Sequence, residues 1–148
     1  MSDTLPFGID QSLIGSEFDS STSEPVTAED IHEYASSLGE TYAGYFGPNP
    51  IAPPTFCMKF RGNRFSHPSI PADAFRRGFD AGKDIHFGVP IRPGDVVHTS
   101  NTLHEVYEKT GRSGSMVFVV SRQRMTNQRG ETVATIDNRF MLRPKADA

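Results

Sequence analysis

Apolar residues first fall at helical spacing in the segment after Thr27. They occupy positions i, i+3, i+4 and i+7 and so share one face of a helix. These residues are Ile31, Tyr34, Ala35 and Leu38. Thr27 is a favoured N-cap residue, the first turn is acidic, and Gly39 follows the last apolar position. The pattern predicts a short amphipathic helix that ends at Gly39.

The next stretch, residues 42–54, is aromatic and rich in glycine and proline. Prolines at this density exclude both regular helix and regular strand. Pro54 suits the first position of a helix, and apolar residues follow it. We therefore expect a second, more hydrophobic helix over about 54–61, and a loop with little regular structure over 62–83.

From residue 84 onward the pattern is typical of β-strands. Strands are expected over 85–91, 96–109, 115–126 and 132–142. Turn residues separate them at 92–95, 111–114 and 127–130. The apolar positions change parity between Leu103 and Val106, which predicts a β-bulge there.

Met116–Val120 is apolar at every position, so both faces of its strand need to be covered. Two helices followed by antiparallel strands predict an α+β fold with a helix packed on a curved sheet. In so short a chain, the expected cover for the second face is another subunit. We expect a flexible N-terminus over 1–12, one domain over 13–143 and a tail over 144–148.

Length and composition limit the class of protein. The chain has 148 residues and a mass of 16.3 kDa, which is enough for one domain with an ordinary core. Its longest apolar run, Met116–Val120, is far below the roughly 18 residues that span a bilayer. The N-terminus lacks the features of a secretory signal, and one cysteine gives no disulfide framework. A cytoplasmic protein without a membrane segment is expected.

Charge is distributed unevenly along the sequence. Residues 1–58 contain nine acidic and no basic residues, whereas residues 59–148 contain 15 basic and nine acidic ones. The resulting charges of −9 and +6 restore the overall −3. Because the basic residues are scattered, an ordinary solvated surface is favoured over a polyanion-binding one. An isoelectric point of 5.9 argues against nucleic-acid binding.

Several motifs, taken in order, resemble those of the MaoC-like or FAS1-like dehydratase N-terminal domain. They follow the first helix, and the resemblance runs from about residue 14 to residue 143. The motifs are Ile51-Ala-Pro-Pro-Thr-Phe56, Ile85-His-Phe-Gly-Val-Pro-Ile-Arg-Pro-Gly-Asp95, Val106-Tyr-Glu-Lys-Thr-Gly-Arg112 and Asn127-Gln-Arg-Gly-Glu131-Thr-Val-Ala134. The resemblance implies a hot-dog fold, in which about five antiparallel strands wrap a central helix, here 54–61. It also implies (R)-specific hydration of 2-enoyl thioesters or dehydration of 3-hydroxyacyl thioesters on CoA or acyl carrier protein, with no cofactor and no metal.

Active relatives carry a catalytic Asp and His in a Gly-Asp-x-Asn-Pro-aliphatic-His motif after the first helix. Here residues 39–45 read Gly-Glu-Thr-Tyr-Ala-Gly-Tyr, so Glu40 replaces the Asp and Tyr45 replaces the His. A tyrosine with a pKa near 10 is a poor proton shuttle at neutral pH. The resemblance therefore implies the substrate-binding, weakly or non-catalytic partner of a catalytic hot-dog subunit.

Other residues carry weaker expectations. By the resemblance, Phe46, Pro54, Thr55 and Phe56 are the substrate-binding candidates, near an oxyanion site at a helix N-terminus. The aromatic residues around positions 42–60 fit an acyl tunnel and a plain core equally well. His86, His98 and His104 are expected to be solvated strand residues, and Cys57 a small buried one.

Three alternatives remain from the sequence. Arg61, Arg64, Arg76 and Arg77 either meet the phosphates of a carrier or are solvated surface charges. The chain could instead be a homodimeric acyl-CoA thioesterase in which Glu40 activates water. It could also be an acyl-thioester binding or assembly protein with no chemistry of its own.

Overall fold

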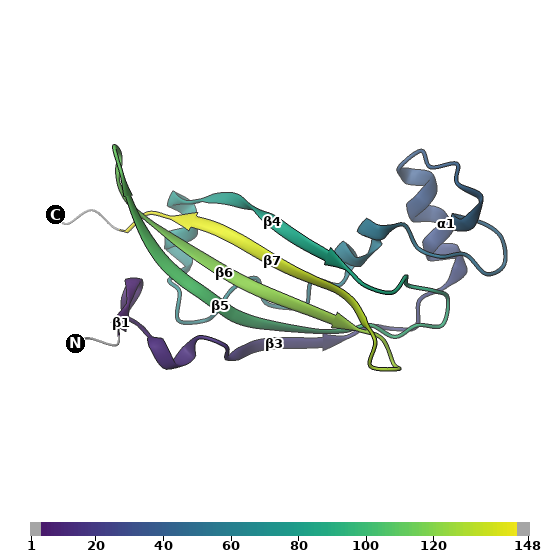
Figure 1. The fold of residues 1–148 in the computed structure, drawn as a ribbon, viewed down its shortest axis with the longest axis horizontal. Helices are drawn as coiled ribbons and strands as arrows, with labels where there is room; N and C mark the ends of the chain where they lie inside the picture. The colour runs from purple at the N-terminus through teal and green to yellow at the C-terminus, as the bar shows by residue number, and fades with distance from the viewer. Residues whose placement is uncertain (1–3, 145–148) are drawn as a thin grey trace.

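The computed structural model describes residues 4–144, and its main feature is one antiparallel sheet (Figure 1). The five strands run in the order β3-β5-β6-β7-β4. They are β3 (Glu17–Thr22), β4 (Phe79–Phe87), β5 (His98–Gly111), β6 (Gly114–Thr126) and β7 (Thr132–Leu142). The long β5, β6 and β7 follow one another along the chain and pair as a meander. This confirms the α+β class and the predicted sheet of five strands.

The helix α1 (Ala28–Ser37) begins where the sequence predicts. The Thr27 hydroxyl accepts a hydrogen bond from the Asp30 backbone N–H at 3.0 Å, and the Asp30 carboxylate accepts one from the Thr27 N–H at 3.2 Å. This reciprocal capping box satisfies donors that the first turn leaves free. Ile31 and Ala35 are buried on the inner face of α1, which lies in a lobe beyond one end of the sheet (Figure 1).

The second predicted helix is shorter and tighter than expected. It is the 3₁₀ helix η4 (Pro54–Lys59), and it begins at Pro54 as predicted. Prolines at positions 53 and 54 limit how the segment can start, and the chain turns away at Phe60. Phe56 and Cys57 are both 1% exposed and join the core formed with α1 and the sheet.

The region 62–83 is more ordered than predicted. It contains the 3₁₀ helix η5 (Ala72–Arg77), and β4 already begins at Phe79 and ends at Phe87. The start was missed because β4 is an edge strand, paired only with β7, and eight of its nine residues are exposed. Such a strand lacks the apolar alternation by which a half-buried strand is detected.

The bulge in β5 is confirmed at the predicted place. The register with β6 shifts between Leu103 and Glu105, so Leu103 and Val106 both reach the inner face and are buried. Met116–Val120 is covered in part by its own chain. Phe118 stacks on Tyr107 with ring centroids 5.0 Å apart, and the Lys109 ammonium lies 5.7 Å from each ring centroid. A second subunit on this face would therefore contact only those parts of the Tyr107–Phe118 stack that remain accessible.

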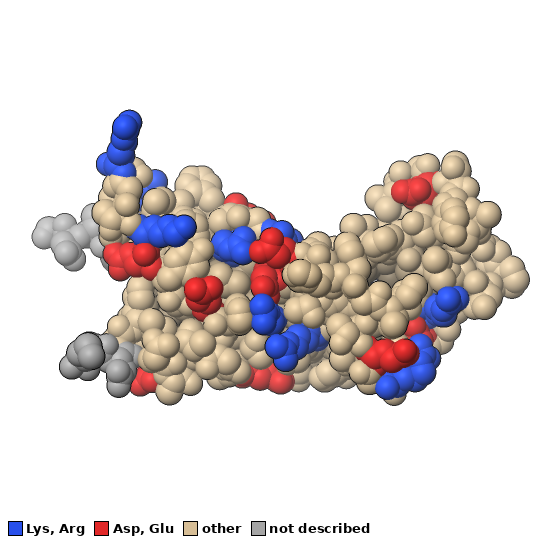
Figure 2. Space-filling model, viewed as in Figure 1, with Lys and Arg blue, Asp and Glu red and all other residues tan. Residues whose placement is uncertain are grey.

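Figure 2 shows the face of the sheet opposite η4, where basic and acidic side chains alternate. Arg122 pairs with Asp137 and Arg139 pairs with Asp84, both at 2.7 Å. Mixed signs of this kind fit a solvated surface rather than a polyanion-binding one. The surface is indented between the sheet and the lobe that carries α1 (Figure 2).

The N-terminal residues that the structure describes are not a free tail. β1 (Thr4–Leu5) pairs with β2 (Ile9–Asp10), with η1 (Pro6–Gly8) between them and η2 (Gln11–Leu13) after them. Ile9 is 1% exposed and packs in a core cluster with Leu103, Val117 and Leu142. Of the tail expected over 144–148, residues 145–148 lie outside the described part of the chain. Within residues 4–144, no helix combines the length and the apolar character needed to cross a membrane.

Candidate functional site

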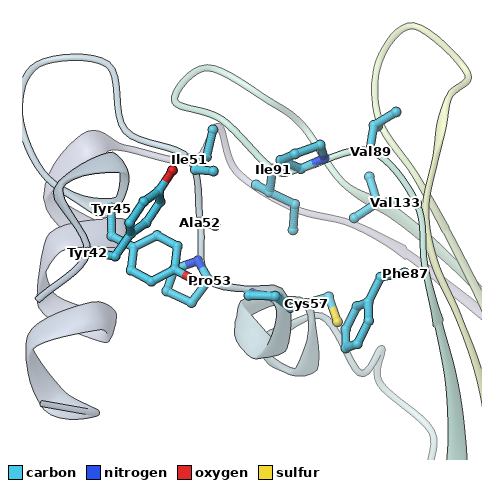
Figure 3. A pocket seen from close by; sticks show the side chains of 13 residues that line it. Tyr42, Tyr45, Ile51, Ala52, Pro53, Cys57, Phe87, Val89, Ile91 and Val133 are labelled. Atoms are coloured by element: carbon cyan, nitrogen blue, oxygen red, sulfur yellow. The ribbon is translucent and has the colours of Figure 1, made fainter. Parts of the chain in front are cut away.

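An apolar pocket lies between the lobe of α1 and the adjacent end of the sheet (Figure 3). Its volume is about 160 Å³, and four stretches of chain line it. These are residues 42 and 45, residues 51–54 with Cys57, residues 87–91, and Val133. Apart from the two tyrosine hydroxyls and one thiol, the lining side chains are apolar. Such a pocket suits an apolar part of a small molecule.

Backbone hydrogen bonds fix the walls of this pocket. Ala52 N–H donates to the Ile91 carbonyl at 2.8 Å, which joins the loop before η4 to the loop after β4. Gly88 N–H donates to the Val133 carbonyl at 2.8 Å. A side chain at Gly88 would overlap the Thr132 carbonyl oxygen, so glycine lets this loop lie directly on β7. The pocket is therefore preformed.

A polar network behind the pocket holds two turns together. The Asp95 carboxylate is almost fully buried and accepts hydrogen bonds from Arg92 N–H at 2.9 Å and Gln128 Nε2 at 2.8 Å. Arg129 approaches the same carboxylate at 3.5 Å. These contacts tie the 92–95 turn to the 127–130 turn, and both turns belong to motifs that carry the family resemblance. In this structure the contacts between the two turns hold the 92–95 turn, which directly follows the pocket-lining residues 87–91.

The structure brings together only some of the candidate site residues. Tyr45 and Pro54 line the pocket, and Phe56 is buried directly beneath it in the core. Thr55 is exposed, and its hydroxyl lies 2.8 Å from the Tyr34 hydroxyl. Of the four substrate-binding candidates, Pro54 is thus the one that reaches the pocket.

Phe46 and Glu40 lie outside the pocket lining. Phe46 stacks on His32, with ring centroids 6.0 Å apart. Glu40 is exposed just after α1, and within residues 4–144 its carboxylate has no hydrogen-bonding or ionic partner. The two positions of the degenerate dyad, Glu40 and Tyr45, are therefore not presented to one common pocket.

The pocket offers little acid-base chemistry. Tyr42 and Tyr45 meet edge to face with ring centroids 4.9 Å apart (Figure 3). Burial raises the pKa of the Cys57 thiol, so this thiol stays protonated at neutral pH. At the start of η4, Pro54 has no N–H and the Phe56 N–H already donates to the Pro53 carbonyl at 2.9 Å. The amides expected to form an oxyanion site are thus mostly engaged or absent.

The histidines of the sheet do not complete the site. His98 Nδ1 lies 3.0 Å from the Thr22 hydroxyl, and His104 is half-buried on β5. His86 is exposed on β4. None of the three contacts Glu40. Among residues 4–144, no group of three or more His, Cys, Asp or Glu side chains is placed to hold a metal ion.

The pocket residues to which the sequence analysis gave no site role include Phe87, Val89, Ile91 and Val133. The first three were assigned to a regular strand over 85–91, whereas the strand ends at Phe87. The signal that could have shown this is Gly88-Val-Pro90, because a glycine and a proline so close together favour a loop over a central strand.

The family model of the FAS1-like dehydratase domain region matches residues 12–136. The chain belongs to this family. This FAS1-like dehydratase domain is 24% identical, over 95% of its length and 99% of the relative's, to the UPF0336 protein SCO4636 of Streptomyces coelicolor. The family assignment confirms the resemblance seen in the sequence.

Two solved structures show the fold of this FAS1-like dehydratase domain. It superposes on a chain of the ChsH1-ChsH2 complex from Mycobacterium tuberculosis with a TM-score of 0.71 and 16% identity, covering 93% of this chain and 90% of that one. It superposes on the R-hydratase PhaJ1 of Pseudomonas aeruginosa with a TM-score of 0.63 and 15% identity, covering 96% and 88%. The fold is the hot-dog fold, as predicted. The central helix is represented by the short η4.

Proposed function

We propose that this chain is the substrate-binding subunit of an (R)-specific 2-enoyl or 3-hydroxyacyl thioester hydratase-dehydratase, with the catalytic Asp and His supplied by a partner hot-dog chain. Membership of the FAS1-like dehydratase family and the fold shared with the R-hydratase PhaJ1 support the reaction class. The observation that carries the division of labour is the pocket itself, which is preformed and apolar but holds no carboxylate or imidazole.

The reaction explains why such a pocket needs help. Hydration requires a base to deprotonate water, an acid to protonate C2 of the enoyl group, and donors that stabilise charge on the thioester oxygen. Tyr45 brings a phenol rather than a carboxylate or an imidazole to the pocket, and Glu40 lies outside it. The chain can thus bind an acyl group, while proton transfer depends on groups from outside it.

β4 offers the place where a partner chain would contribute those groups. As an edge strand it leaves one row of backbone N–H and C=O groups without a neighbour in the sheet. Phe79 and Phe87 are 65% and 52% exposed near its two ends. Phe87 also lines the pocket, so a chain added along β4 would reach the pocket mouth. The ChsH1-ChsH2 complex, one chain of which shares this fold, joins two proteins, and this supports such a partner.

The test compares the full chain alone with the chain plus a candidate partner that carries the intact Asp and His motif. We expect no hydration of 2-enoyl-CoA esters by the chain alone and robust hydration by the pair. Glu40→Gln should leave the activity of the pair unchanged, as should the exposed control Glu24→Gln. Robust turnover by the chain alone that disappears in Glu40→Gln would overturn the proposal, and release of free thiol from acyl-CoA would indicate a thioesterase instead.

A further inference from the structure

A second hollow, lined by different residues, lies on the inner face of the sheet beyond η4. Its volume is about 370 Å³, more than twice that of the apolar pocket. Its basic residues are Arg61, Arg64 and Lys83. Apolar side chains of Met58, Phe65 and Phe140 complete the walls, and the amides of Gln123 and Asn138 form a polar floor. Cationic, amide and apolar groups thus meet in one cavity.

The backbone that carries the two arginines is held by polar side chains of the sheet. Gln123 Nε2 donates to the Arg61 carbonyl at 2.8 Å, and Asn101 Nδ2 donates to it at 3.2 Å. The Asp19 carboxylate accepts from the Asn63 N–H at 2.7 Å and the Arg64 N–H at 3.0 Å. Because both anchor points are fixed, little backbone ordering remains when a ligand binds.

Gly62 shows how close this loop lies to its anchors. Its φ of +83° is in the left-handed region, and a Cβ there would lie 2.5 Å from both Asn101 Nδ2 and Asp19 Oδ2. A glycine is therefore required for the loop to follow the buried Asn101 amide and the half-buried Asp19 carboxylate. The arrangement places the Arg61 and Arg64 side chains at the cavity from neighbouring points of one tight turn.

The positive charge of the cavity is only partly balanced. Lys83 pairs with Asp80 at 3.4 Å. In the part of the chain that the structure describes, neither Arg61 nor Arg64 has a carboxylate within ion-pair distance of its guanidinium group. Asp19 faces the backbone of this turn, and its Oδ2 accepts hydrogen bonds from the Asn63 and Arg64 N–H groups and from Asn101 Nδ2. Two guanidinium groups thus remain available to an anion.

We propose that this hollow binds an organic anion, a carboxylate or a phosphate carried on an apolar chain, through Arg61 and Arg64. Guanidinium groups match the paired oxygens of both anions with two parallel hydrogen bonds. Phe65 and Phe140, whose ring centroids are 4.6 Å apart, give the apolar chain a surface to pack on. The site goes beyond the proposed thioester function and requires neither a partner chain nor turnover.

The experiment titrates the full chain with octanoate, octyl phosphate and octan-1-ol by isothermal titration calorimetry. We expect at least one anion to bind about 10-fold or more tightly than the neutral alcohol, and its affinity to fall as salt is added. The anion that binds more tightly shows whether the site prefers a carboxylate or a phosphate. In ¹⁵N-resolved NMR spectra, the side-chain amides of Gln123 and Asn138 should shift with the anions.

Variants connect this binding to the two arginines. Arg61→Ala with Arg64→Ala should weaken anion binding by about 10-fold or more and leave octan-1-ol unchanged, because both side chains are exposed and carry no core packing. Replacing both arginines by lysine should retain part of the affinity, since lysine keeps the positive charge but cannot donate two parallel hydrogen bonds to one anion. Arg112→Ala, at the distant hairpin between β5 and β6, is the control. Equal affinity for the alcohol, an unaffected double Ala variant, or the same loss in Arg112→Ala would each overturn the proposal.

Discussion

The hydroxyl of Tyr34 on α1 lies 2.8 Å from the hydroxyl of Thr55 at the start of η4. The Tyr34 ring also meets the Phe56 ring edge to face, with centroids 5.4 Å apart. One residue of α1 thus contacts two consecutive residues of η4. This places the lobe of α1 against the segment that forms one wall of the apolar pocket.

Removing the hydroxyl of Tyr34 should loosen this connection. We expect Tyr34→Phe to lower the free energy of unfolding by about 0.5–1.5 kcal/mol, toward the lower end because the hydrogen bond is exposed. Urea denaturation measures the change. Thr55→Val should have a similar effect, and the double variant should lose little more than either single one. Tyr42→Phe, whose hydroxyl makes no hydrogen bond within residues 4–144, is the control. Fully additive losses would show that the two hydroxyls do not interact.

The core beneath the pocket depends on one aromatic side chain. Phe56 is 1% exposed and contacts Phe60 as well as Tyr34. Truncation removes buried area and leaves a cavity, so Phe56→Ala should cost about 3–5 kcal/mol in the free energy of unfolding. Phe79→Ala removes an equally large but exposed ring and should change stability by about 0.5 kcal/mol or less. Similar losses for the two variants would contradict this account of the core.

These residues also show how far the sequence could predict the structure. α1 and the hairpin between β5 and β6 were predicted well because capping, helical spacing and tight turns act over a few residues. The parity change before Val106 likewise gave the bulge in β5 directly.

The pocket was predicted less completely because it joins segments that are far apart in the sequence. Tyr45 and Phe87 both line it because the Ala52 N–H donates to the Ile91 carbonyl and the Gly88 N–H donates to the Val133 carbonyl, and no local pattern specifies those pairings. The position of Glu40 was likewise open, since α1 ends before it and the fold of the following loop decides where its side chain points.

The ion pair between Arg122 and Asp137 should make stability depend on pH. Arg122 Nε and Nη2 donate to the two Asp137 oxygens at 2.7 and 2.9 Å, and these hydrogen bonds lower the pKa of the Asp137 carboxyl in the folded chain. A lowered folded pKa contributes stability at pH values above the unfolded pKa of about 3.9. That contribution is lost as the pH falls through the lower, folded pKa.

We therefore expect Asp137→Asn to be less stable than the wild type at pH 7, with the difference shrinking as the pH is lowered below about 4. Urea denaturation at several pH values measures both the stability difference at pH 7 and its decrease toward acid pH. Asp73→Asn, which breaks a longer and more exposed pair with Arg77, should cost only about 0–1 kcal/mol at pH 7. A difference for Asp137→Asn that grows toward acid pH would have the wrong sign and would refute this assignment.

Cys57 provides a direct probe of the apolar pocket, because it is the chain's one cysteine and lines the cavity from η4. Burial raises the pKa of its thiol, and the thiolate is the reactive form. A disulfide reagent should therefore label native Cys57 slowly at neutral pH and rapidly after denaturation with guanidinium chloride. The matched control is Ser36→Cys in a Cys57→Ala background, which places a thiol on the exposed face of α1 and should react at the ordinary rate. If an acyl thioester occupies this pocket, a saturating 2-enoyl-CoA ester should slow the labelling of Cys57 further and leave the control unchanged. Equal labelling rates for the two thiols in the absence of ligand would show that the pocket is open to water at Cys57.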